Sequence, residues 1–261
     1  MDLHLDGRNF LITGGSSGLG LGLAHTLVDE GARVLLVGRS KDKLDAAAEE
    51  VSAHASADQV LTQPADVRKL DDLQGAIDAA DRTWGRLDGL VNNAGVHTGS
   101  GFETTTDDEW QTDFELKLLA KVRGIRQSLP LLRKSDAPSV LNVLSIYAKF
   151  QPPKSMPSSV YRAAGLALTN GLSRDLAADR IRVNAILIGF VHSDQWVRGA
   201  AASDQDVSEW EADRAKQLGI PLGRVGKTEE FADVAAFLLS SRASYLTGTA
   251  INVDGGLSLV S

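Results

Sequence analysis

Short apolar runs alternate with amphipathic stretches along the whole chain. Runs of Val, Leu and Ile bounded by turn residues predict strands, and apolar residues recurring every three or four positions predict helices. The predicted strands are 9–13, 33–38, 60–63, 88–93, 139–145, 181–189 and 249–256. The predicted helices are 18–30, 41–54, 69–84, two stretches within 107–133, 158–178 and 228–240.

This alternation of strand and helix predicts an α/β fold. Strands that are apolar on both faces are typical of a parallel sheet with helices on both sides. Without repeats or linkers, residues 1–261 are expected to form a single Rossmann-like, doubly wound domain. The polar segment 193–227, which carries Trp196 and Trp210, interrupts the pattern and is interpreted as an inserted lid over a substrate.

Composition narrows the possible functions. The net charge is −7 and no basic run occurs, which argues against nucleic-acid binding but not against a local phosphate site. The absence of cysteine excludes disulfides and thiolate metal ligands, and no metal site is expected. Since no signal-like N-terminus or long apolar run is present, we expect a soluble, cytoplasmic protein acting on a small molecule, without a membrane partner.

The most informative motif follows the first predicted strand, where the sequence reads LITGGSSGLG. Gly14, Gly18 and Gly20 follow the pattern Gly-x-x-x-Gly-x-Gly at the start of a helix. Glycine allows a tight turn and the close approach of a pyrophosphate, and the free amides at a helix N-terminus attract anions. The alternative is a plain strand-to-helix turn.

Six motifs in this order resemble the short-chain dehydrogenase/reductase family over nearly the whole chain. They are TGGSSGLG at 13–20, ADV at 65–67, NNAG at 92–95, Ser145 at a strand end, IRVNA at 181–185 and GTAINVDGG at 248–256. The resemblance implies nicotinamide cofactor binding in a homotetramer, with Asn92 structural. The implied cofactor contacts are Thr13, Gly14, Ser16, Ser17, Gly18, Leu19, Gly20, Asp66, Val67, Asn93, Ala94, Gly95, Gly189, Val191 and Ser193, which keeps a hydroxyl where the family has Thr.

The end of the second strand bears on the choice between NADP and NAD. NAD-specific sites place a carboxylate there to bind the ribose 2′-hydroxyl, but this strand ends at Gly38 and continues with Arg39. The Arg39 guanidinium can pair with a 2′-phosphate, so NADP(H) is favoured, with NAD still possible. Ser17 weakens this reading, because relatives that prefer NADP often carry a second basic residue in the glycine loop.

The family's catalytic residues are Asn, Ser, Tyr and Lys, and this chain departs from three of them. Ser145 matches the Ser, and Ser158, 13 residues later, falls where the family has Tyr. Arg162 then takes the Lys position, on the same helical face and 22 residues before Asn184 as in the family. Lys117, seven residues after Trp110, stands at the Asn position. Arg162 is thus expected both to hold the cofactor ribose and to contribute to catalysis.

A rival register takes Tyr161 as the family's Tyr, which leaves Gly165 at the Lys position and the phenol without an activating cation. In the favoured register, the Ser158 hydroxyl is too weak an acid to replace a phenol, and Arg162 cannot release its proton. The proton donor then has to be another side chain. The candidates are Lys117, Tyr147, Tyr161 and His192.

Three classes of function are compatible with these substitutions. The first is an NADP(H)-dependent oxidoreductase with an atypical active site, acting on a carbonyl or alcohol. The second is a nucleotide-binding protein whose redox activity is weak or lost. The third is a non-redox enzyme, such as a lyase, an isomerase or a dehalogenase; Arg162 is similar to the arginine of halohydrin dehalogenases, but those relatives lack the glycine loop kept here.

Overall fold

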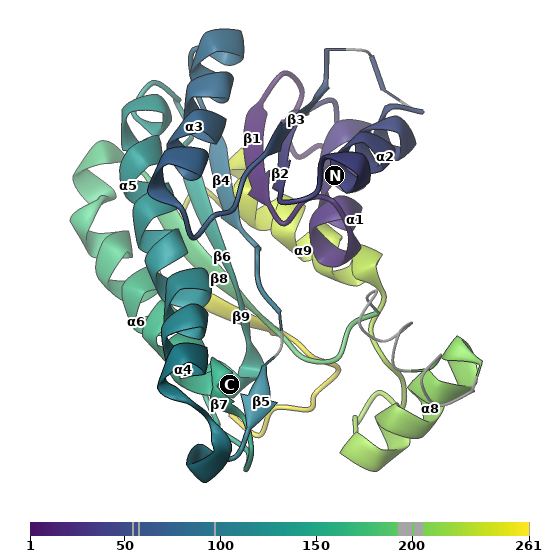
Figure 1. The fold of residues 1–261 in the computed structure, drawn as a ribbon. Helices are drawn as coiled ribbons and strands as arrows, with labels where there is room; N and C mark the ends of the chain where they lie inside the picture. Colours follow the sequence, from purple (N-terminus) through teal and green to yellow (C-terminus); the bar gives the residue numbers. More distant parts are fainter. Residues whose placement is uncertain (54, 57, 97, 193–199, 201–205, 261) are drawn as a thin grey trace.

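The protein forms a seven-stranded parallel sheet in the order β3-β2-β1-β4-β6-β8-β9 (Figure 1). The structure, a computed structural model, describes residues 1–261 except 54, 57, 97, 193–199, 201–205 and 261. The strands are β1 (Asn9–Thr13), β2 (Arg33–Gly38), β3 (Val60–Pro64), β4 (Gly89–Asn92), β6 (Ser139–Ser145), β8 (Arg182–Ile188) and β9 (Ala250–Val253).

Helices cover both faces of the sheet, as the sequence predicts (Figure 1). On one face lie α1 (Gly18–Asp29), α2 (Lys41–Ser52) and α9 (Thr228–Leu239). On the other lie α3 (Leu70–Trp84), α4 (Asp107–Phe114), α5 (Ala120–Leu132) and α6 (Ser158–Asp175). The doubly wound α/β architecture is therefore confirmed.

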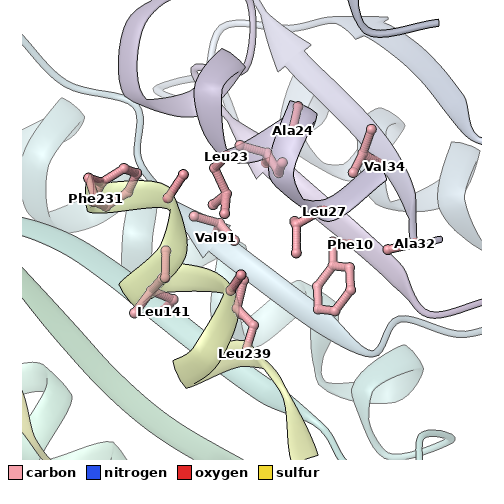
Figure 2. Packing of buried hydrophobic residues seen from close by; sticks show 14 of the residues in the cluster. Phe10, Leu23, Ala24, Leu27, Ala32, Val34, Val91, Leu141, Phe231 and Leu239 are labelled. Atoms are coloured by element: carbon pink, nitrogen blue, oxygen red, sulfur yellow. The ribbon is translucent and has the colours of Figure 1, made fainter. Parts of the chain in front are cut away.

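The strand β1 shows how the sequence builds two cores. Its side chains alternate between the faces of the sheet, so Phe10 packs with Leu27 of α1 and Leu239 of α9 (Figure 2). Leu11 joins the opposite cluster, which includes Leu73 of α3. Burial of each such side chain contributes about 1.5–3 kcal/mol, and together these contacts fix α1 and α9 against the sheet.

Some boundaries differ from the sequence prediction. The last strand ends at Val253 rather than 256, because Gly255 and Gly256 have φ angles of 63° and 85° that break an extended strand. The predicted helix 158–178 ends at Asp175 and is followed by a 3₁₀ turn, Ala177–Asp179. The two helices predicted within 107–133 are joined by a π-helical turn, Glu115–Leu119.

The carboxyl ends of the parallel strands meet at one edge of the sheet. From β1 the sheet is extended first through β2 and β3 on one side and then through β4 and β6 on the other, so the strand order reverses there, which is where α/β sheets bind ligands. A two-stranded ribbon of β5 (Gly99–Ser100) and β7 (Met156–Pro157), not expected from the sequence, lies at the same end (Figure 1).

The predicted lid contains one described helix, α8 (Val207–Leu218), which lies apart from the sheet in Figure 1. Trp210 on α8 has the Arg214 guanidinium 5.5 Å from its ring centre, whereas Trp196 lies outside the described residues. Within the described part of the chain, no helix is long and apolar enough to cross a bilayer. The same residues contain no cluster of three or more His, Asp or Glu side chains that could hold a metal ion.

Candidate active site

The glycine-rich turn between β1 and α1 has the shape of an anion cradle. Gly14 and Gly18 have φ angles of 68° and 54°, which favour glycine. A Cβ atom on Gly20 would lie 2.2 Å from the Gly14 carbonyl oxygen, so no larger residue fits without moving the turn. Ser17, the N-cap of α1, makes no side-chain cap, and this leaves the amides of the first turn for a bound anion. The turn therefore fits a pyrophosphate.

The loop after β4 is fastened to this turn by hydrogen bonds. The Thr13 hydroxyl donates to the Val91 carbonyl and accepts from the amides of Asn93 and Ala94, at 3.0–3.1 Å. The Asn93 side-chain amide donates to the carbonyls of Thr13 and Gly14 at 3.1 and 3.0 Å. Thr13 and Asn93 thus set the spacing of these two loops at the carboxyl edge of the sheet.

Asn92 lies in a separate buried chain of hydrogen bonds. Its side chain donates to Asn142 of β6, which donates to Thr169 of α6, each at 3.0 Å. These two hydrogen bonds link β4 and β6 to α6. This arrangement is consistent with the structural role expected for Asn92.

Two arginines lie near the carboxyl ends of β2 and β3. Arg39 is exposed just after β2, while Arg68 holds the Asp66 carboxylate through Nε at 3.0 Å and Nη2 at 2.6 Å. The hydrogen bond from Arg68 lowers the pKa of Asp66, and the charge of Arg39 lowers it further. Val67, which lies between Asp66 and Arg68 in the sequence, is buried. Sequence reasoning missed Arg68, whose only signal was its position two residues after Asp66.

Arg162 projects from α6 beneath the loop that follows β4. Its Nη1 donates to the Val143 carbonyl of β6 at 2.9 Å, and its Nη2 lies 3.2 Å from where a Cβ of Gly95 would be. Burial lowers the pKa of Arg162 to about 10, offset in part by the charge of Asp113. Its buried Nε has no hydrogen-bond partner among the described residues.

Lys117 lies in the π-helical turn and is fully buried. Its Nζ donates to the Thr98 hydroxyl at 2.8 Å and to the Asp113 carboxylate. Burial lowers the pKa of Lys117 to about 8, because the loss of solvation outweighs the nearby carboxylate and Arg162 adds repulsion. Such π-helical turns often occur at functional sites. Thr98 and Asp113 were also missed, although Asp113 precedes Lys117 by one helical turn.

Ser145 and Ser158, the two serines expected at catalytic positions, each lie at the end of an element. Ser145 ends β6, and its Oγ accepts a hydrogen bond from the Tyr147 amide at 3.3 Å. Ser158 is the first residue of α6 and is buried. Tyr147 packs its ring edge-on to Phe150, with centroids 5.5 Å apart, and burial raises its pKa.

Tyr161 and Arg162 are adjacent in sequence but contact different elements. The Tyr161 ring packs against Trp110 and Phe114 of α4, with centroids 5.8 and 5.7 Å away. Burial, followed by the charge of Asp113, raises the pKa of its phenol. The structure thus brings Arg162, Lys117 and Asp113 within electrostatic reach of one another, while the Tyr161 ring lies among the aromatic side chains of α4.

The segment after β8 lies at the same carboxyl edge of the sheet, next to the end of β9. A Cβ on Gly189 would lie 2.6 Å from the Asp254 Cβ, and the Gly189 amide donates to the Val253 carbonyl at 3.0 Å. Val191 is buried, and Ser193 lies outside the described residues. The His192 ring lies 2.6 Å from Glu211 of α8 and lines a pocket of about 430 Å³ between α8 and the start of α9.

Comparisons with known proteins find relatives over nearly the whole chain. A family model described as Enoyl-(Acyl carrier protein) reductase matches residues 14–258. The 3-oxoacyl-[acyl-carrier-protein] reductase FabG of Chlamydia pneumoniae is 30% identical over 257 residues, covering 98% of this chain and 99% of its own.

Two solved structures are similar over nearly their whole length. One is a NADPH-bound short chain oxidoreductase from Pseudomonas aeruginosa PAO1 containing an atypical catalytic center, with a TM-score of 0.93 and 34% identity over 98% of this chain and 99% of that one. The other is L-sorbose reductase from Gluconobacter frateurii complexed with NADPH and L-sorbose, with a TM-score of 0.94 and 32% identity over 100% of both chains.

Proposed function

This chain belongs to the short-chain dehydrogenase/reductase family, and on that premise we propose that it is an NADP(H)-dependent oxidoreductase with an atypical active site. Its substrate is a carbonyl compound or the corresponding alcohol. Ser158 and Arg162 take the places where the family has Tyr and Lys, and Lys117 takes the place of Asn. NADPH in the two solved relatives supports NADP(H) as the cofactor.

The position of Arg162 is the observation that carries this proposal. Its guanidinium lies next to Gly95 in the loop after β4 and donates a hydrogen bond to the Val143 carbonyl of β6. A cation at that place can bind a ribose hydroxyl and stabilise negative charge that develops on a substrate oxygen. The aromatic packing of Tyr161 against α4 supports the same register, because it directs the phenol ring to a different element.

The chain's own residues would divide the work as follows. The Gly14–Gly20 turn and the Asn93–Gly95 loop would hold NADPH, which supplies the hydride when bound. The Ser145 hydroxyl would donate a hydrogen bond to the substrate oxygen, and Arg162 would stabilise its charge. Lys117 would be the proton source, because a pKa of about 8 lets its ammonium release a proton near neutral pH. Of the expected lid, 193–227, the described helix α8 would border the substrate, while 193–199 and 201–205 lie outside the described residues.

The test is cofactor consumption on a panel of ketones, diketones and ketoses, followed by the absorbance of the reduced nicotinamide. We expect NADPH oxidation in the wild type, with a large loss in Arg162→Met and in Lys117→Met. NADPH binding without turnover on any substrate would instead indicate a nucleotide-binding protein. Product formation without a change in nicotinamide absorbance would indicate a non-redox enzyme.

A further inference from the structure

Lys121 is a buried lysine that the proposed chemistry does not use. It is the second residue of α5 and is 2% exposed. Among the described residues its Nζ has one hydrogen-bond partner, the Lys117 carbonyl oxygen at 2.9 Å. An ammonium has three protons to donate, so two of them have no acceptor there. Holding a charge at such a place is costly unless a counter-charge arrives.

The side chain of Lys121 lies beside the loops expected to hold the cofactor. It lines a small cavity together with Thr13, Val67 and Ala94. These three residues belong to the loops expected to hold the cofactor. Lys121 therefore adjoins, from the interior of the protein, the loops that would hold the cofactor.

The charges around Lys121 do not balance within the protein. Lys117 in the π-helical turn and Arg162 in α6 both repel its ammonium, and only Asp113 in α4 attracts it. Burial is the largest effect, and it lowers the pKa of Lys121 to about 7. Two buried lysines and the partly buried Arg162 thus share one buried carboxylate, and above neutral pH the Lys121 amine is mostly uncharged in the free protein.

We propose that Lys121 takes up a proton from solvent when NADP(H) binds, and that the resulting ammonium holds the anionic cofactor from beneath. The neutral amine gains one proton, and no bond of the cofactor is made or broken. The cofactor's phosphates supply the negative charge that Asp113 alone does not. This inference rests on the proposed function, since it requires that the cleft binds a dinucleotide.

Proton uptake makes the affinity depend on pH in a defined direction. Below about pH 7 the Lys121 amine is already charged, so its protonation no longer makes the NADPH dissociation constant change with pH. Above that pH, each unit weakens binding by up to about tenfold, until the pKa of the bound state is reached.

The experiment is calorimetric titration of the full chain with NADPH at pH 8, in phosphate and in Tris. These buffers differ in ionisation enthalpy, so the difference in heat counts the protons taken up. We expect at least about one proton in the wild type and in Lys134→Met, an exposed control. Lys121→Met takes up about one proton fewer, and its dissociation constant depends less on pH; the remaining dependence belongs to Lys117, whose pKa is about 8. Lys121→Arg, which stays charged, also takes up about one proton fewer than the wild type but binds NADPH more tightly than Lys121→Met.

Two results would overturn the inference: a wild type that binds NADPH without proton uptake, or a Lys121→Met variant that takes up as many protons as the wild type. If Lys121→Met does not fold, the wild type and Lys121→Arg still decide the matter. Absence of NADPH binding at every pH would contradict the proposed function, and is thereby distinguished from a failure of this inference alone.

Discussion

Replacement of Lys121 by Met should change how stability depends on pH. Burial lowers the pKa of Lys121 from its ordinary value of 10.5 to about 7. Between these values the unfolded chain binds a proton that the folded chain does not, so stability falls as pH drops from 10.5 and levels off below about 7. The difference of about 3.5 pKa units corresponds to about 5 kcal/mol at neutral pH.

The measurement is the thermal midpoint of the cofactor-free protein at pH 7, 8 and 9. From pH 7 to 9 the Lys121 contribution rises by about 2 kcal/mol, because the amine is already half uncharged at pH 7; this corresponds to roughly 4–8 °C in a chain of this size. The wild type should therefore gain stability over this interval, and Lys121→Met should gain much less. The pKa of Lys117 is also lowered, so in both proteins stability still rises with pH above pH 8, with a smaller slope in Lys121→Met.

A packing defect caused by Met would shift the midpoint equally at every pH, so the slope isolates the charge. Lys134→Met is the matched control, since Lys134 is exposed and pairs with Asp81 at the surface. Midpoints that change in parallel with pH in the wild type and in Lys121→Met would refute the reasoning.

The remaining predictions concern the cofactor and the assembly. Arg39→Ala should raise the NADPH dissociation constant by about tenfold and leave that of NADH unchanged; an equal effect on both would show that Arg39 does not read the 2′-phosphate. Gly20→Val should abolish the stabilisation by NADPH, because its Cβ would lie 2.2 Å from the Gly14 carbonyl oxygen. A bulky residue at Gly18 should have the same effect. If NADPH still stabilises these variants, the turn is not part of the cofactor site. Sedimentation at micromolar concentration should show a homotetramer, or at least a dimer, and a monomer would contradict the oligomer.

The sheet and its order of elements could be predicted from the sequence because each strand is a short apolar run with clear turn residues on both sides. The π-helical turn could not, since 107–133 reads as helix throughout and one extra backbone residue in a turn leaves no mark on an amphipathic pattern. The β5–β7 ribbon was equally hidden, because two-residue strands carry no periodicity.

The glycine-rich turn between β1 and α1 could be predicted because its glycines meet a local backbone requirement. The charge network around Lys117 could not, because it depends on which residues the fold brings together. Thr98 reaches Lys117 from the loop after β4, and Arg162 approaches from α6. Lys121 reads as an ordinary helix surface lysine until the packing of α5 shows that it is buried.

The most direct test of the proposed atypical active site is the effect of Tyr161→Phe on NADPH-dependent carbonyl reduction. Removal of the phenol oxygen leaves the ring contacts with Trp110 and Phe114 in place, so folding and NADPH affinity should be unchanged. We expect kcat/KM within about threefold of the wild type, since the phenol does not transfer the proton in our register. A fall of about a thousandfold, with folding and NADPH affinity intact, would show that Tyr161 is the acid and would contradict the register of Ser158 and Arg162.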